Sequence, residues 1–139
     1  MPEAHVEILR LRSTERFQLI DITGMVEDAV VKSGVSRGLV LVFAPHTTAS
    51  IIINEGEGGL MSDIMEKAKD FTQPGSTKWR HNLIDRNAHA HIGSAIFGSE
   101  RCLPVVGGRV ARGPWQNIMF FEMDGPREER MVYVVVVGE

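Results

Sequence analysis

Apolar and polar residues alternate, or apolar residues form short unbroken runs, along most of the chain. Both patterns are typical of strands that are buried on one face or on both. Val6, Ile8 and Leu11 recur with polar residues between them, whereas the run 39–43 is apolar throughout and predicts a central strand covered on both faces. The predicted strands are 6–11, 16–20, 39–43, 49–53, 102–106, 109–111, 117–123 and 131–137.

Three segments have the helical period instead. In the first, 24–33, the apolar residues fall on one face, Asp21 or Thr23 is placed to cap the start, and Gly34 suits the end. The others are 60–69 and 87–97, separated by a polar stretch, 72–80. Strands and helices are mixed along the chain without a linker or repeat. The sequence therefore predicts one compact α+β domain over residues 1–139, with mixed or antiparallel sheets and about three helices.

Composition narrows the classes of function. The chain of 139 residues is 43% hydrophobic and 24% charged, with a net charge of -3, so nothing in the bulk charge favours nucleic acid or an anionic membrane as partner. The start of the chain lacks a signal-peptide pattern and no apolar run approaches membrane length, which predicts a cytoplasmic protein. The single cysteine, Cys102, is interpreted as a small buried hydrophobe rather than a nucleophile.

Histidines are the first candidates for chemistry. His46 lies in the loop 45–48, which interrupts an apolar run, and His81 ends the polar stretch. His89 and His91 are two residues apart, so one helix would direct them differently. No pair has a recognised metal-binding spacing. From spacing alone a three-histidine metal site stays open, but ordinary surface or loop histidines are favoured.

Two other polar groups are candidates, each with a structural alternative. Asn54 and Glu55 could supply a metal ligand or a general base, or simply form a polar turn. Arg109 could bind a phosphate, and Trp115 with Gln116 could offer a stacking face beside an amide, although Trp115 fits a core or interface position equally well. The glycines match neither a P-loop nor a dinucleotide fingerprint.

In combination, these segments resemble the YjbQ family over essentially the whole chain. The resemblance rests on an ordered set of segments: Pro45-His46-Thr47-Thr48-Ala49, Ile53-Asn54-Glu55, Arg80-His81-Asn82, Asn87-Ala88-His89-Ala90-His91, Gly113-Pro114-Trp115-Gln116 and Phe121-Glu122-Met123-Asp124-Gly125-Pro126-Arg127. It implies a homotrimeric α+β fold and a weak thiamine-phosphate-synthase activity.

The resemblance also implies roles for particular residues. His46, His81 and His91 match the family's histidines and would bind a divalent metal ion, zinc in the first place and magnesium as the alternative. The remaining candidates are Glu55, Arg109 and Gln116 as catalytic residues, and Asn54, Asn87, Trp115 and Arg127 as substrate-binding residues. Two positions depart from the family: Pro114 replaces a threonine, and His89 replaces an acidic residue.

Two hypotheses of function follow. In the first, the protein is an enzyme that joins a pyrimidine pyrophosphate to a thiazole phosphate with loss of pyrophosphate. In the second, it is a non-catalytic metal- or ligand-binding trimer with only incidental synthase activity. Both predict a homotrimer whose partner is a small phosphorylated molecule.

Overall fold

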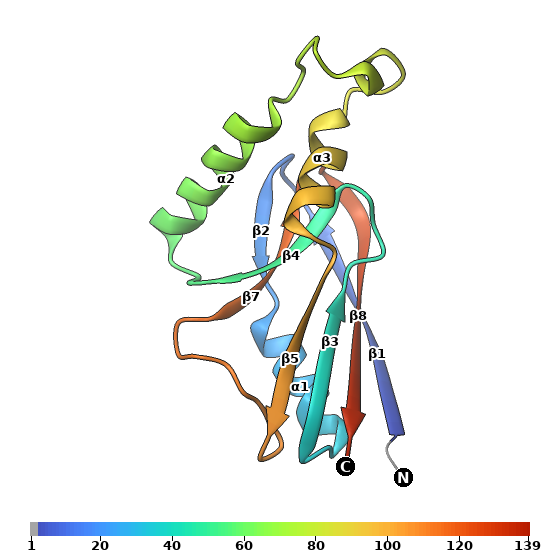
Figure 1. Cartoon of the computed structure of the whole chain (residues 1–139), viewed down its shortest axis with the longest axis vertical. Coiled ribbons are helices and arrows are strands. Elements are labelled where there is room, and N and C mark those ends of the chain that lie inside the picture. Colours follow the sequence, from blue (N-terminus) through green and yellow to red (C-terminus); the bar gives the residue numbers. More distant parts are fainter. Residues whose placement is uncertain (1–2) are drawn as a thin grey trace.

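Two antiparallel sheets form the frame of the molecule (Figure 1). The computed structural model describes residues 3–139. The large sheet has the strand order β1 (Glu3–Ser13), β8 (Arg127–Gly138), β3 (Arg37–Phe43), β5 (Glu100–Val106) and β6 (Arg109–Val110). The small sheet has the order β2 (Gln18–Asp21), β7 (Asn117–Glu122) and β4 (Ala49–Asn54). The helices are α1 (Thr23–Ser33), α2 (Gly58–Thr72), α3 (Ala88–Phe97) and the short 3₁₀ helix η1 (Arg80–Leu83).

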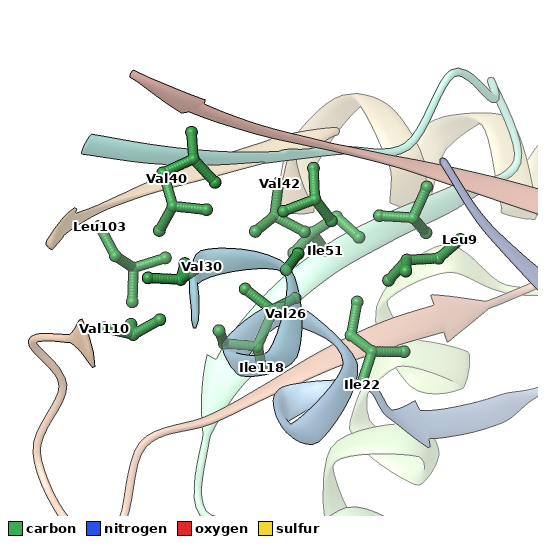
Figure 2. Close-up of a cluster of buried hydrophobic side chains, with 14 of the residues drawn as sticks. Leu9, Ile22, Val26, Val30, Val40, Val42, Ile51, Leu103, Val110 and Ile118 are labelled. Carbon is green, nitrogen blue, oxygen red and sulfur yellow. The ribbon is translucent and has the colours of Figure 1, made fainter. Parts of the chain in front are cut away.

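The main core lies between the inner face of the large sheet, α1 and one face of the small sheet (Figure 2). Val132, Val134 and Val136 of β8 point inward at every second position, as the period of a strand requires. In β7, Ile118 and Phe120 face this core. Burial of such side chains from water supplies most of the favourable free energy of folding.

A second, smaller core covers the other face of the small sheet. Met119 and Phe121 of β7 pack there against α2 and α3, which Figure 1 shows beside β4. Because both faces of β7 are covered, its run from Ile118 to Glu122 is buried throughout. The order of layers is therefore large sheet, then α1 with the small sheet, then α2 and α3.

The predicted fold class is confirmed: the chain is one compact α+β domain with three α-helices and antiparallel sheets. The helix predicted at 24–33 begins at Thr23, whose backbone N–H donates to Asp21 Oδ1 over 2.9 Å. The polar stretch 72–80 is expected to be an exposed loop, and η1 begins at its last residue. None of the helices described over residues 3–139 is long and apolar enough to cross a membrane.

Two sequence interpretations are wrong for the single chain. β3 is central, but its outward side chains Leu39 and Phe43 are 54% and 37% exposed, so only one face is covered. Cys102, expected to be buried, is exposed. Cys102 and the exposed side chains of β3 lie on the outward face of the large sheet. We call this surface the outer apolar face, and its most exposed members are Val6, Ile8, Leu39, Phe43, Val106 and Val137.

Candidate functional site

A pocket forms where the chain changes sheets twice at the same end of the molecule. The loop 44–48 runs from β3 of the large sheet to β4 of the small one, and the turn 123–126 returns from β7 to β8. The start of α3 closes a third side. The pocket is lined by Pro45, His46, Thr47, Thr48, Asn87, His91, Arg127 and Arg130. The structure thus brings His46 and His91 together with Asn87 and Arg127, four of the residues proposed from the sequence.

His46 is held by one residue of β8. Its Nε2 lies 3.0 Å from the backbone nitrogen of Met131 and 3.1 Å from the backbone oxygen of the same residue. In the tautomer that carries the proton on Nε2, this nitrogen donates to the Met131 carbonyl and Nδ1 keeps its lone pair; in the other tautomer Nε2 accepts from the Met131 N–H and Nδ1 carries the proton. Burial, and next the positive charge of Arg130, hold the pKa of His46 below its ordinary value. The ring is therefore neutral at pH 7.

The orientation of His81 is set by a chain of hydrogen bonds. Arg127 Nη2 donates to Asp124 Oδ2 over 2.8 Å, and Asn87 Nδ2 donates to the same oxygen over 2.9 Å. A carboxylate only accepts, so the Asn87 amide must present its Nδ2 to Asp124 and its Oδ1 to His81. Oδ1 lies 3.0 Å from His81 Nε2, which therefore carries the proton. Nδ1 of His81 is left with a free lone pair.

His91 lies between the other two histidines. Its ring centroid is 4.8 Å from that of His81, and it lines the pocket with His46. Within residues 3–139, however, no three His, Cys, Asp or Glu side chains converge closely enough to hold a metal ion as they stand. The donor set itself suits zinc, because neutral imidazole nitrogens are among its preferred ligands.

The floor of the pocket is a buried acid–base network. Arg130 Nε donates to Glu122 Oε1 over 2.8 Å, and Arg130 Nη2 donates both to Glu122 Oε2 and, over 2.9 Å, to Thr48 Oγ1. Ser13 Oγ donates to Glu122 Oε1 over 2.7 Å and accepts from the backbone N–H of Arg127 over 2.9 Å. Burial alone would raise the pKa of Glu122, but the hydrogen bonds from Arg130, Ser13 and Asp124 N–H outweigh it and lower the pKa.

The other predicted residues lie away from this pocket within one chain. β4 pairs Ala49 with Glu122 at the pocket end and Asn54 with Asn117 at the other. Five residues of strand span about 17 Å, so Asn54 and Glu55 are that far from the histidine loop. Trp115 and Gln116 precede Asn117 and lie at the same distant end, with Trp115 71% exposed.

Arg109 is also distant. It pairs with Val106, which pairs in turn with Arg37 at the start of β3, whereas the histidine loop follows the end of that strand. In Figure 1 this hairpin lies at the bottom and α3 toward the top. One chain therefore separates the predicted catalytic residues Glu55, Arg109 and Gln116 from the predicted metal ligands.

The two departures from the family pattern lie outside the pocket. His89 is fully buried, its Nε2 is 2.8 Å from the Met123 carbonyl oxygen, and its ring packs 5.3 Å from that of Phe17. Pro114 is the second residue of a turn in which Gln116 N–H donates to the Gly113 carbonyl over 3.1 Å. Proline is favoured at that position of a β-turn, so its missing N–H is not needed there.

Sequence reasoning missed Glu122 and Arg130 as members of the site, whereas Thr48 belongs to the loop 45–48 that the sequence singles out. The period of β8 contains a signal for one of them: Arg130 shares the inward phase of Val132, Val134 and Val136. Glu122 is likewise the only charged residue in the apolar run 118–123. An isolated charge at a core position indicates a buried partner, although the sequence does not say which one.

A family model described as UPF0047 protein YjbQ-like matches residues 7–139. Among sequences, a UPF0047 protein of Methanothermobacter thermautotrophicus is 41% identical over 99% of this chain and 94% of its own length. The UPF0047 protein YugU of Bacillus subtilis is 35% identical over 96% of this chain and 99% of its own.

Solved structures agree closely with the fold. The crystal structure of a YbjQ-like protein of unknown function from Sulfolobus solfataricus has a TM-score of 0.98 and 47% identity, and both chains are covered completely. A hypothetical protein of Aeropyrum pernix gives a TM-score of 0.93 at 47% identity, covering 96% of this chain and 98% of that one. These similarities establish the family and the fold.

Proposed function

Because the chain belongs to the UPF0047, YjbQ-like family, we propose that it is a metal-dependent enzyme that acts on a small phosphorylated molecule in the histidine pocket. The observation that carries the proposal is the composition of this pocket. The imidazoles of His46 and His91 line the same pocket as the arginines 127 and 130, and burial lowers the pKa of His46. Nitrogen ligands for a metal ion and guanidinium donors for an oxyanion thus border the same space.

The proposed metal ligands are His46, His81 and His91, with zinc as the first candidate and magnesium as the second. The support is that His81 engages one ring nitrogen with a protein oxygen, and His46 does the same in the tautomer that carries the proton on Nε2, which leaves the other nitrogen for a ligand. Such contacts fix the tautomer and orientation of metal-binding histidines. When bound, a divalent ion supplies Lewis-acid neutralisation of charge on phosphoryl oxygens.

The proposed reaction joins a pyrimidine pyrophosphate to a thiazole phosphate. A carbon–oxygen bond to pyrophosphate breaks, the thiazole nitrogen bonds to that carbon, and pyrophosphate leaves with the electron pair. The leaving group therefore accumulates negative charge as the bond breaks, and N–H donors aimed at it lower the barrier. Arg127 is suited to this, because its guanidinium is oriented by Asp124 and still 46% exposed at the side chain.

We propose further that the protein is a homotrimer that buries the outer apolar face. Leu39, Val106 and Val137 are 54%, 62% and 42% exposed in the single chain; Leu39 pairs with Val137 on β8, and Val106 on β5 is diagonal to Leu39 on the other side of β3. A contiguous apolar surface of this kind marks an interaction site more often than a free surface. The unbroken apolar run of β3, typical of a strand covered on both sides, supports a second covering layer from other copies.

For Asn54, Glu55, Arg109, Trp115 and Gln116, a role in the same reaction requires that a neighbouring copy bring them to the pocket. Mixing two inactive variants tests this requirement. If the site is shared, mixtures of His46→Ala and Glu55→Ala chains regain turnover, because some pockets combine two intact contributions. If turnover stays absent in co-refolded mixtures, the site is not shared in this way.

The alternative is a non-catalytic trimer that binds a metal ion or small anion, with any synthase activity incidental. The specific observation in its favour is that one chain holds the predicted general base, Glu55, about 17 Å from the pocket. Turnover distinguishes the two: the alternative predicts metal binding without steady-state consumption of both substrates.

Metal content and turnover should be measured together on wild type, His46→Ala and a control, His5→Ala. His5 lies on β1 at the end of the large sheet away from the pocket, so its removal leaves the proposed ligands intact. We expect zinc at one equivalent per chain in wild type and His5→Ala, and loss in His46→Ala. Equal metal content in all three would refute the three-histidine site.

A further inference from the structure

Glu122 and Arg130 form a buried ion pair in the floor of the pocket, and the proposed reaction gives no role to Glu122. Glu122 is 0% exposed and Arg130 5% exposed. Burying two charges costs several kcal/mol of desolvation each, and apolar residues of similar volume often stabilise a fold as well or better. Stability alone is therefore a weak reason for charges at this position, and the donors that the pair leaves free point to a ligand.

A count of donors identifies the free ones. A guanidinium has five N–H groups. Nε–H and one Nη2–H of Arg130 go to Glu122, and Nη2 also donates to Thr48 Oγ1. Within residues 3–139, no acceptor contacts Nη1, so its two N–H groups remain available.

These two donors border the pocket. Arg130 is a lining residue of the pocket, and its Nη1 is not among the sealed side-chain atoms that lack a partner, which are Ser50 Oγ and His89 Nδ1. Nη1 therefore reaches the open space although the rest of the side chain is enclosed. Glu122 and Thr48 hold the other two nitrogens, so the guanidinium cannot turn away. The pocket thus has a fixed donor edge in its floor.

We propose that Arg130 is the anchor for a phosphoryl or pyrophosphoryl group in this pocket, with Glu122 as its positioning residue. The inference rests on the proposed function for the identity of the substrate class, but its geometry is independent of the metal ion.

The choice of a phosphoryl group over a carboxylate follows from the number of donors around the pocket. Arg127 uses Nε and Nη2 to bind the backbone and side chain of Asp124, and no acceptor among residues 3–139 binds its Nη1. Thr47 adds an exposed hydroxyl at the rim. Donors from three sides suit the three terminal oxygens of a phosphoryl group, whereas a carboxylate offers two oxygens in one plane.

The net charge of the two arginine–carboxylate pairs determines how the pocket can bind an anion. Each arginine is already paired with a carboxylate, so the pairs Arg130–Glu122 and Arg127–Asp124 contribute no net charge. They bind an anion through oriented N–H groups, not through excess positive charge. We therefore expect pyrophosphate to bind in the absence of metal, and more tightly when zinc is present.

The test uses isothermal titration of inorganic pyrophosphate into the full-length protein, with and without zinc, and acetate as the carboxylate probe. Two variants are compared with wild type. The double variant Glu122→Met with Arg130→Met removes both charges together and so avoids an unpaired buried carboxylate. The variant Arg130→Lys keeps the charge opposite Glu122 but loses the planar fork of donors. The control is Arg37→Met with Glu139→Met, an exposed pair at the far end of the large sheet.

We expect both pocket variants to lose about tenfold or more in pyrophosphate affinity, since hydrogen bonds to charged groups are individually strong. The control should bind like wild type, and acetate should bind more weakly than pyrophosphate to all four proteins. The inference is overturned if wild type does not bind pyrophosphate, if acetate binds as tightly, or if a folded pocket variant keeps wild-type affinity.

Failure of the proposed function gives a different result. A wild-type protein that holds no zinc and consumes neither substrate, yet binds pyrophosphate through Arg130, overturns the enzyme proposal and supports this inference. A wild type that turns over both substrates while the double variant does so with unchanged KM overturns the inference alone.

Discussion

Replacing Arg130 with methionine should reveal how strongly the buried pair is coupled to the fold. The substitution leaves the Glu122 carboxylate at 0% exposure with only Ser13 Oγ and the Asp124 N–H as donors. Removing one partner of a buried pair destabilises proteins by about 3–5 kcal/mol. That is a large share of the ~5–15 kcal/mol that stabilises a typical domain.

The pH dependence of this loss distinguishes an unpaired charge from lost packing. In wild type the pKa of Glu122 is below its ordinary value, so the unfolded state binds more protons and the stability from this group is lost as pH falls. In Arg130→Met the main partner is gone, so burial raises the pKa of Glu122 above its unfolded value. The folded state then binds more protons, and the variant gains stability from this group as pH falls.

Urea unfolding at pH 7 and pH 5 measures both effects. We expect the variant's midpoint to lie about 1.5–2.5 M below that of wild type at pH 7, taking m near 2 kcal/mol/M. The gap should narrow at pH 5. The double variant with Glu122→Met should recover most of the loss. A difference between the two urea midpoints that is small at pH 7, or that is the same at pH 7 and pH 5, would refute the assignment of an unpaired buried carboxylate.

Three further predictions concern the helix α3 and the large sheet. Burial holds the pKa of His89 below its ordinary value, so the unfolded state binds more protons below about pH 6.5 and stability falls there, by up to ~1.4 kcal/mol per pH unit. His89→Gln should flatten this slope in thermal melts between pH 7 and 5, and an unchanged slope would contradict the assignment. Asn87→Ala removes the acceptor that sets the His81 tautomer, so zinc affinity in a chelator competition should fall about 10–100-fold; equal affinity in a folded variant would argue against this role. Leu39→Arg places a charge on the outer apolar face and should yield folded monomers in sedimentation velocity, whereas an intact trimer would exclude this face from the interface.

Much of the fold could be predicted because local patterns determine it. The period of two in 131–137 and the helical period of 24–33 each identify one element and its buried face. The exposed face of β3 could not be predicted, because an apolar run indicates that a strand is covered but not whether its own chain or another copy covers it. Leu39 is apolar in either case.

The site was only partly predictable for a related reason. His46 and His91 are recognisable as candidates, but their common pocket depends on two crossings between sheets, which no local pattern encodes. The separation of Glu55 from the histidines depends on the direction of β4, along which they lie at opposite ends. Arg130 and Glu122 are eight positions apart in sequence, and only the turn 123–126, which leads from the small sheet to the large one, brings them together.

Ser13 links the two acid–arginine pairs, and this has a consequence for evolving or redesigning the pocket. One hydroxyl serves both Glu122 and the backbone N–H of Arg127, so a substitution of Ser13 or Glu122 changes what the other can tolerate. Groups that share partners show interaction energies of about 0.5–3 kcal/mol. Single-site scans would therefore score useful changes here as harmful. Libraries that vary Ser13, Glu122 and Arg130 jointly would reach sequences that stepwise selection cannot.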